Sequence, residues 1–360
     1  MPLKPYLKRV IEDRANLSRE EASALLRHIL AGEATEIQLA ALLAALAIRG
    51  ESPAEIAGFV DAMRAAATSL PLTPAEQAVL VDTCGTGADL SGTFNISTAA
   101  ALVAAAAGAT VAKHGNRAVT SQSGSADVLE ALGIPVALTP AQAADALRRH
   151  RFAFLHAPSL HPAMKVVMPV RRALGIRTIF HLVGPLSNPA GARAQIMGVY
   201  APHLVPIAAE AMRLLGARHA FVVHGDIGPG ASGARGCGLD ELSISGPSRL
   251  AEVRGDSVTL LQTTPEQVGL TSAPIESLRG GDANANAAIL RSIFAGERSP
   301  RRDIVLLNAA AVLITAGIVP ASDTVAALRA GIAAAAAAID SGGVTALVAA
   351  LADRQPTTNN

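Results

Sequence analysis

The sequence predicts an α/β protein in which a small all-helical N-terminal domain precedes a larger α/β domain with a mostly parallel central sheet and flanking helices. Three observations predict this class. Helix-start signals recur without any strand pattern over residues 3–70. After about residue 79, short apolar runs alternate with helical stretches. The chain has 360 residues, 50% of them hydrophobic, which is enough for two such domains.

Capping residues predict the N-terminal helices. Residues 18–21 and 35–38 have the Ser/Thr-x-x-Glu/Gln form of a capping box. Residues 52–55 and 73–76 add proline at the first helical position. We therefore expect several short helices, and we place a helical domain at residues 1–75, joined by helices from later in the chain.

The alternation of apolar runs and helical stretches predicts the sheet, because strands separated by helices need crossover connections and so run parallel. The last three apolar runs, at residues 242–244, 250–253 and 257–261, are close together in the sequence and predict a small antiparallel addition to the sheet. Helices resume near residue 284, so we assign residues 76–350 to the α/β domain and expect a frayed tail at 351–360. The predicted strands are residues 78–82, 110–113, 135–138, 152–156, 195–200, 219–224, 242–244, 250–253 and 257–261, and the predicted helices between them include 98–107, 141–150, 163–174 and 205–215.

Composition excludes several classes of function. A net charge of +1 argues against a general polyanion-binding surface, and 2% aromatic residues argue against a base-stacking platform, so we expect no nucleic-acid partner. The most apolar run, residues 99–109, is too short to span a bilayer, so we expect no membrane partner. Two cysteines and no apolar signal-peptide core predict a soluble, cytoplasmic protein.

The densest chemical signal is a glycine-rich loop between a predicted strand and an alanine-rich helix. Gly85 and Gly87 let backbone N–H groups approach an anion, and Ser97 and Thr98 stand where the unpaired N–H groups of the helix favour phosphate. The same pattern fits a plain strand-to-helix loop in which Ser97 or Thr98 only caps the helix. Neither a Walker loop nor the dinucleotide fingerprint is present.

A second loop follows the next predicted strand and favours the binding interpretation. Lys113, Asn116 and Arg117 are followed by several hydroxyl residues at 121–125. Open α/β sheets bind ligands at the carboxyl ends of their strands. Two such loops on consecutive strands therefore indicate a ligand site.

Two further segments carry charge. Arg171 and Arg172 lie at a predicted helix end, where they either interact with the helix dipole or clamp a carboxylate or phosphate. Asp240 and Glu241 follow a strand and suit Mg²⁺, which takes oxygen ligands and usually keeps waters. Taken alone, such a pair is also typical of an exposed loop.

Short motifs occur at residues 85–87, 95–98, 113–117, 123–127, 161–164, 184–186, 188–189, 238–241, 280–281, 286–287 and 307–310. In this order they resemble the motifs of the anthranilate phosphoribosyltransferases over nearly the whole chain. The resemblance implies a small helical domain joined to a larger α/β domain, usually as a homodimer formed through the helical domain. It also implies transfer of the phosphoribosyl group from phosphoribosyl pyrophosphate to anthranilate, with release of pyrophosphate, in tryptophan biosynthesis.

The resemblance also implies roles by motif. The residues implied to hold phosphoribosyl pyrophosphate are Gly85, Gly87, Asp89, Asn95, Ser97, Thr98 and Lys113, with Thr93 and Ser125 also among the substrate-binding residues. His114, Asn116, His161 and Arg171 are implied to line the anthranilate path, with Arg171 on the carboxylate, and Ser97, Asp240 and Glu241 to contact Mg²⁺. No dedicated catalytic acid or base is implied, because an aryl amine has a free lone pair at pH 7. Transition-state stabilisation is assigned to Lys113 and the metal.

The sequence departs from the family pattern in four places. Ala88 stands where the family commonly has glycine, Gln122 where it often has lysine, and His181 where it usually has asparagine. An insertion at residues 227–237 precedes the acidic pair, and we expect it to be a mobile surface excursion after which residues 238–241 return to the glycine loop. Two alternatives stay open: a related phosphoribosyltransferase or nucleoside-phosphorylase-like enzyme with another acceptor, and a non-catalytic nucleic-acid-binding relative.

Overall fold

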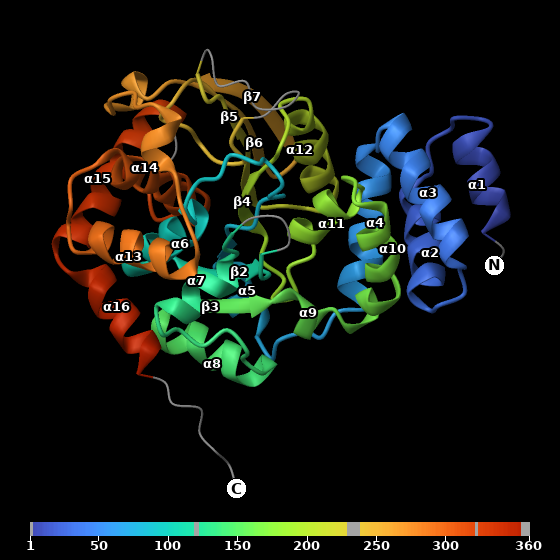
Figure 1. Ribbon diagram of the computed structural model, residues 1–360, viewed down its shortest axis with the longest axis horizontal. Coiled ribbons are helices and arrows are strands. Elements are labelled where there is room, and N and C mark those ends of the chain that lie inside the picture. The colour runs from blue at the N-terminus through green and yellow to red at the C-terminus, as the bar shows by residue number, and fades with distance from the viewer. Residues whose placement is uncertain (1–2, 119–121, 229–237, 321–322, 354–360) are drawn as a thin grey trace, which may run out of the picture.

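A computed structural model describes residues 3–118, 122–228, 238–320 and 323–353 of the chain. A small lobe of N-terminal helices stands beside a larger body built on a sheet (Figure 1). The lobe contains α1 (Lys4–Ile11), α2 (Arg19–Leu30), α3 (Glu36–Arg49) and α4 (Pro53–Ala65). Ser18, Thr35 and Ser52 form the predicted capping boxes at the starts of α2, α3 and α4.

Helices from later in the chain lie against this lobe. α10 (Met168–Leu174) packs on α3 and α11 (Phe180–Leu186) packs on α4 (Figure 1). The rings of Phe59 and Phe180 meet at 6.2 Å between centroids across the second contact. Apolar residues of both segments share one buried cluster, so the lobe and the body are joined by a common core.

The sheet has seven strands in the order β3-β2-β1-β4-β5-β6-β7. The first five of these are parallel to their neighbours, and β6 and β7 add an antiparallel hairpin to β5. Both features were predicted and are confirmed. The strands are β1 (Leu80–Asp82), β2 (Thr110–Gly115), β3 (Phe152–His156), β4 (Ala194–Gly198), β5 (His219–Gly225), β6 (Ser248–Arg254) and β7 (Ser257–Thr263).

Helices cover both faces of the sheet. α6, α14 and α15 pack over one face in a large apolar cluster, and α8 and α12 pack over the other. The remaining helices are α5 (Pro74–Ala78), α6 (Ile96–Ala106), α7 (Ser125–Ala131), α8 (Pro140–His150), α9 (Ala157–Leu160), α12 (Leu204–Leu214), α13 (Ala283–Phe294), α14 (Pro300–Thr315), α15 (Thr324–Asp340) and α16 (Gly343–Ala352), with 3₁₀ turns at Pro162–Val166, Glu266–Val268 and Ile275–Leu278. Among the described residues no single helix is long and apolar enough to cross a membrane, and only the bent pair α15 and α16 has the length and composition when taken together.

Two predicted strands are wrong. Residues 135–138 form an irregular link before α8, because Pro135 has no N–H to donate and Val136 is buried as part of the apolar core instead. Residues 242–244 form no strand, because the side chain of Asn308 both donates to and accepts from the backbone of Leu242. The predicted helix at 163–174 is divided at Val167 into a 3₁₀ turn and α10.

The order of the strands fixes where a ligand can bind. From β1 the chain winds outward through β2 and β3, then returns to the other side of β1 to form β4 and β5. The carboxyl ends of β1 and β4 therefore lie at the point where the winding direction reverses, which is the usual ligand crevice of open α/β sheets.

Candidate active site

The glycine-rich loop leaves β1 at this reversal point and crosses the end of β4. The backbone N–H of Thr86 donates to the carbonyl of Gly198, at 2.9 Å, which anchors the loop on β4. Gly87 and Ala88 both have positive φ, of 60° and 61°. Ala88 therefore adopts a left-handed backbone that glycine would adopt without strain, at a cost of about 1 kcal/mol for a residue with a Cβ.

Lys113 and His114 are adjacent in β2, so their side chains point to opposite faces of the sheet. The ammonium group of Lys113 points to the glycine loop and donates to the hydroxyls of Thr83 and Ser97, at 3.0 and 3.3 Å. Lys113 is 1% exposed. His114 points to the other face, toward the helical lobe. The edge of the sheet thus has a cationic side and a histidine side.

Asp240 and Glu241 lie against the same loop and the start of α6. A carboxylate oxygen of Asp240 accepts from the backbone N–H of Gly87 at 2.7 Å, and one of Glu241 accepts from the N–H of Ser97 at 3.0 Å. Asp89 completes the group, because its carboxylate accepts from the N–H of Asp240 at 3.4 Å. The chain thus returns to the glycine loop after the insertion, as expected, although residues 229–237 lie outside the described part.

These half-buried carboxylates repel one another. Burial, reinforced by the charges of Asp89 and Glu241, raises the pKa of Asp240 well above its ordinary value. Burial also raises the pKa of Glu241 to about 7, against the lowering effect of Lys113. Unneutralised buried carboxylates call for a cation, so their chemistry fits the implied Mg²⁺. No group of three or more His, Cys, Asp or Glu residues in the described ranges is arranged to hold a metal by itself.

A buried aspartate connects the strands beneath the site. Asp82, at the end of β1, accepts from the backbone N–H groups of Thr83 and His114 and from the side-chain amide of Asn188, at 2.7, 3.1 and 2.8 Å. It ties β1, β2 and the segment after α11 together directly behind Lys113. Burial raises the pKa of Asp82 to about 6.

Two buried histidine rings form the other side of this edge of the sheet. The rings of His114 and His161 lie 5.1 Å apart between centroids, and both residues are buried. Within the described residues none of their four ring nitrogens has a hydrogen-bond partner. Burial lowers the pKa of His114 to about 3 and that of His161 to about 4, so both are neutral at pH 7. Two neutral imidazoles with free nitrogens offer an aromatic, weakly polar surface.

Arg171 lies near this surface, on α10. Its guanidinium lies over the ring of Phe180 at 5.3 Å from the centroid and also contacts the sulfur of Met168 at 3.8 Å. Its charge contributes to lowering the pKa of His181 to about 4, after the larger effect of burial. Arg171 is half-buried, whereas Arg172 is exposed. The two arginines therefore differ in exposure, and only Arg171 faces the histidine side.

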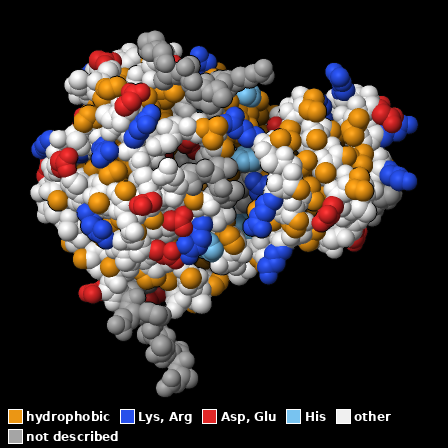
Figure 2. All heavy atoms as spheres, viewed as in Figure 1, with side chains coloured by type: hydrophobic (Ala, Val, Ile, Leu, Met, Phe, Trp, Pro, Cys, Tyr) orange, Lys and Arg blue, Asp and Glu red, His pale blue; other side chains and the backbone are white. Residues whose placement is uncertain are grey.

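An arginine that the sequence did not single out joins the two sides. Arg177 donates to the carbonyl of Ala88 in the glycine loop, and its guanidinium stacks on Tyr200 at 4.3 Å from the ring centroid. The ring of His181 meets the same tyrosine edge-on at 6.4 Å. Figure 2 shows Lys, Arg and His side chains gathered along the hollow between the body and the helical lobe.

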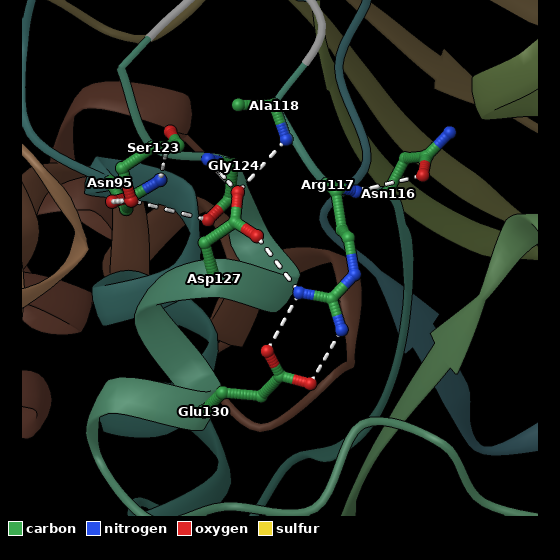
Figure 3. Close-up of polar contacts among 8 residues, drawn as sticks. All are labelled: Asn95, Asn116, Arg117, Ala118, Ser123, Gly124, Asp127 and Glu130. Carbon is green, nitrogen blue, oxygen red and sulfur yellow. Dashed lines mark hydrogen bonds and ion pairs between the residues drawn. The ribbon is translucent and has the colours of Figure 1, made fainter.

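The second glycine loop is held at both ends by one carboxylate. Asp127, on α7, accepts from the backbone N–H groups of Ala118 and Gly124, each at 2.9 Å (Figure 3). Arg117 bridges Asp127 and Glu130, at 3.1 and 2.6 Å. This arrangement orients the exposed side chain of Asn116 at the rim.

Asn95 connects the two glycine loops with the C-terminal motif. Its side chain exchanges hydrogen bonds with Ser123, at 3.1 and 3.3 Å, and accepts from the side-chain amide of Asn286 at 2.9 Å. Asn286 in turn accepts from the N–H of Gly281. Thr93 lies beside it in an isolated bridge with Arg279.

The sequence-predicted residues thus divide into three sets. Gly87, Asp89, Ser97, Lys113, Asp240 and Glu241 share one hydrogen-bond network, with Gly85 in the same glycine loop; His114, His161 and Arg171 lie toward the lobe; Thr93, Asn95 and Asn116 lie in the loops beside the site, and Ser125 begins α7. Thr98 is fully buried, and its hydroxyl has no partner among the described residues. Thr98 therefore lies in the interior at the start of α6, and its contact with phosphoribosyl pyrophosphate stays a prediction.

Sequence reasoning assigned no role to Asp82, Asn188, Asn286, Arg177 or Tyr200. Asn188 and Asn286 stood inside motifs of the family and Asp82 ended a predicted strand, so their positions carried a signal although their partners did not. Arg177 and Tyr200 stood in no motif, and their contacts with the glycine loop could not be read from spacing.

Comparison with known proteins agrees with this arrangement along the whole chain. Residues 77–345 match the glycosyl transferase family, a/b domain, and residues 4–67 match its helical bundle domain. The anthranilate phosphoribosyltransferase of Symbiobacterium thermophilum is 48% identical over 340 residues, which cover 94% of each chain.

Solved structures agree as well. The anthranilate phosphoribosyltransferase of Thermus thermophilus has a TM-score of 0.85 at 42% identity, covering 96% of this chain and 98% of that one. The Saccharomyces cerevisiae enzyme in complex with PRPP and Mg has a TM-score of 0.84 at 26% identity, covering 98% and 97%. The same yeast enzyme in complex with 4-fluoroanthranilate has a TM-score of 0.82 at 25% identity, with the same coverage.

Proposed function

We propose, because this chain belongs to the anthranilate phosphoribosyltransferase family, that it transfers the phosphoribosyl group of phosphoribosyl pyrophosphate to anthranilate and releases pyrophosphate. One observation carries the assignment of the site: Lys113 and His114 point to opposite faces at one edge of the sheet. An anionic donor and an aromatic acceptor can thus meet there from two sides. The relatives reported above support neither another acceptor nor a nucleic-acid-binding role.

On the donor side, this chain supplies groups that bind a leaving diphosphate. The ammonium of Lys113 and the N–H groups of Gly87 and Ser97 converge on the space between the glycine loop and α6. As the bond between C1 of the ribose and the pyrophosphate oxygen breaks, the electron pair leaves with the pyrophosphate, and donors fixed in advance stabilise that charge. Asp82 holds the strand that carries Lys113 in place.

On the acceptor side, His114, His161 and Arg171 hold a planar aromatic amine, and none of them acts as a dedicated base. His114 and His161 present neutral rings, and Arg171 has no carboxylate partner among the described residues, so it is free to take the carboxylate of anthranilate through two parallel hydrogen bonds. The amine nitrogen uses its lone pair to form the new bond to C1 and then loses a proton to solvent. No dedicated acid or base is needed.

Asp240, Glu241 and Ser97 are the groups that would hold Mg²⁺. When bound there, Mg²⁺ neutralises charge on the diphosphate and so lowers the barrier to its departure. The unneutralised carboxylates support this assignment, as does the PRPP and Mg complex of the yeast relative.

We extend the proposal to the domain boundaries, the oligomeric state and the cellular location of the protein. We assign residues 1–75 to the helical domain and 76–350 to the phosphoribosyl-transfer domain, and we expect a homodimer formed through the helical domain. Ile37 and Ile48 support the dimer, because they are 83% and 87% exposed and lie on one face of α3. The low cysteine content supports a cytoplasmic enzyme.

The direct test follows anthranilate fluorescence. Purified protein with phosphoribosyl pyrophosphate and Mg²⁺ is expected to consume anthranilate, with one pyrophosphate released for each anthranilate lost. Omission of phosphoribosyl pyrophosphate is expected to abolish the signal change. Loss of pyrophosphate from the donor without loss of anthranilate would contradict the assigned acceptor.

A further inference from the structure

The two acidic side chains of the site occupy the backbone donors that a diphosphate needs. Asp240 accepts from the N–H of Gly87 at 2.7 Å, and Glu241 accepts from the N–H of Ser97 at 3.0 Å. Ser97 is in the first turn of α6, where the N–H groups have no partner within the helix. Carboxylate and phosphate oxygens are both acceptors, and each N–H makes one good hydrogen bond. A diphosphate can therefore use these donors only after the carboxylates have moved.

Charge works in the same direction. Asp240 is close to the like charges of Asp89 and Glu241, and the ammonium group of Lys113 is the cation of the described residues that acts on Glu241. Lys113 itself is held by Thr83 and Ser97. An anion that enters without a counter-ion meets three half-buried carboxylates and one buried ammonium group, so that it is repelled more than it is attracted.

We propose that Asp240 and Glu241 select the metal-loaded form of the donor substrate, by occupying the N–H groups of Gly87 and Ser97 until a divalent cation draws the carboxylates away. This inference rests on the proposed function and adds a role for the acidic pair before any chemistry occurs. The pair keeps metal-free diphosphate esters out of the site. A cation that binds both the carboxylates and the diphosphate turns the repulsion into a bridge and releases the two N–H groups for the phosphate oxygens.

The test measures binding rather than turnover, by isothermal titration calorimetry with inorganic pyrophosphate as the probe. Wild type is compared with Asp240→Asn/Glu241→Gln in excess EDTA and in excess Mg²⁺. In EDTA the double variant is expected to bind pyrophosphate at least about tenfold more tightly than wild type. In Mg²⁺ wild type is expected to gain at least about tenfold, whereas the double variant gains little.

A matched control separates the local effect from net charge. Glu12→Gln/Asp13→Asn makes the same two chemical changes on an exposed part of the helical lobe and is expected to bind pyrophosphate as wild type does in both conditions. Asp240→Ala, which removes the acceptor as well as the charge, is expected to bind metal-free pyrophosphate more tightly than Asp240→Asn.

Two outcomes overturn the inference. One is a folded double variant that binds metal-free pyrophosphate no more tightly than wild type. The other needs no variant: wild type that binds pyrophosphate equally well in EDTA and in Mg²⁺. Failure of the proposed function looks different, because wild type with Mg²⁺ would then bind pyrophosphate but would not bind phosphoribosyl pyrophosphate or consume anthranilate.

Discussion

The carboxylate of Asp82 accepts a hydrogen bond from the backbone N–H of His114, 3.1 Å away on the neighbouring strand. This bond fixes the stretch of β2 in which Lys113 points to one face and His114 to the other. The two sides of the site therefore share a single buried support, and that support is an ionisable group with no exposed surface.

The buried position of Asp82 gives the fold a pH dependence. Its pKa is raised from 3.8 to about 6, so the folded chain keeps a proton that the unfolded chain has lost between these pH values. The contribution of Asp82 to the free energy of unfolding is present below pH 3.8 and is lost as the pH rises to about 6. At 1.36 kcal/mol per pKa unit, the loss amounts to at most about 3 kcal/mol.

We expect Asp82→Asn to make the slope of unfolding free energy against pH less negative in that window, as measured by urea denaturation. Asp256→Asn, in the exposed turn between β6 and β7, is the control and should leave the slope unchanged. Equal slopes in Asp82→Asn and wild type would contradict the expectation.

Lys113→Met keeps the buried stem and removes the ammonium that faces Thr83 and Ser97. A hydrogen bond to a charged group contributes about 1.5–3 kcal/mol, so we expect the KM for phosphoribosyl pyrophosphate to rise about tenfold or more. The KM for anthranilate is expected to change less, because His114 and His161 lie on the other face. Lys165→Met removes an exposed lysine and serves as the control. Equal changes in both constants would count against the assignment.

Arg171→Ala is expected to raise the KM for anthranilate about tenfold or more, because it removes a bidentate carboxylate donor. Arg172→Ala is the matched control and is expected to be milder, since Arg172 is exposed at the end of α10. Arg171→Lys is expected to rescue poorly, because lysine has no planar two-pronged donor. Steady-state kinetics at low anthranilate decides, and full activity of Arg171→Lys would rule out the carboxylate clamp.

Deletion of residues 227–237 is expected to leave a folded, Mg²⁺-dependent enzyme. Gly225 and Leu239, on either side of the insertion, already exchange both backbone hydrogen bonds, at 2.9 and 2.7 Å. The deletion places Asp226 directly before Gly238 between them, and Asp-Gly is a favoured two-residue hairpin turn. Thermal unfolding and a Mg²⁺ titration of turnover test the shortened chain. Loss of Mg²⁺ dependence would mean that the insertion itself positions the acidic pair.

Ile37→Glu/Ile48→Glu is expected to convert a dimer into a folded monomer, because it places two charges on the exposed apolar face of α3. Light scattering coupled to size exclusion measures the mass. Ile176→Glu, at an exposed isoleucine after α10, is the control and is expected to keep the mass of wild type. A monomeric wild type would contradict the proposed homodimer.

Local chemistry explains what the sequence could predict. Ser18, Thr35 and Ser52 predict helix starts because a capping box uses residues only three apart. Lys113 could be placed at the carboxyl end of a strand for the same reason: the strand and the loop are contiguous. The antiparallel addition followed from two apolar runs separated by a short turn.

Long-range contacts explain what the sequence could not predict. Arg177 reaches the carbonyl of Ala88 across 89 positions of the chain, and nothing in its neighbours marks that partner. The side chain of Asn308, on a helix distant in the sequence, accepts from the backbone N–H of Leu242 in place of a neighbouring strand. Residues 242–244 therefore form no strand, although they have the composition of one. Burial, which separates Arg171 from Arg172, is likewise set by α3 and Phe180 rather than by local sequence.

The crowding of Asp89, Asp240 and Glu241 has a consequence for evolution and engineering. Like charges crowded at half-buried positions lower the stability of the ligand-free chain, so substitution of the acidic pair by neutral residues is expected to raise its melting temperature. Selection for heat resistance alone would therefore drive these positions toward neutral residues and remove turnover first. A thermostabilisation campaign on this enzyme has to hold Asp240 and Glu241 fixed and seek its gains elsewhere.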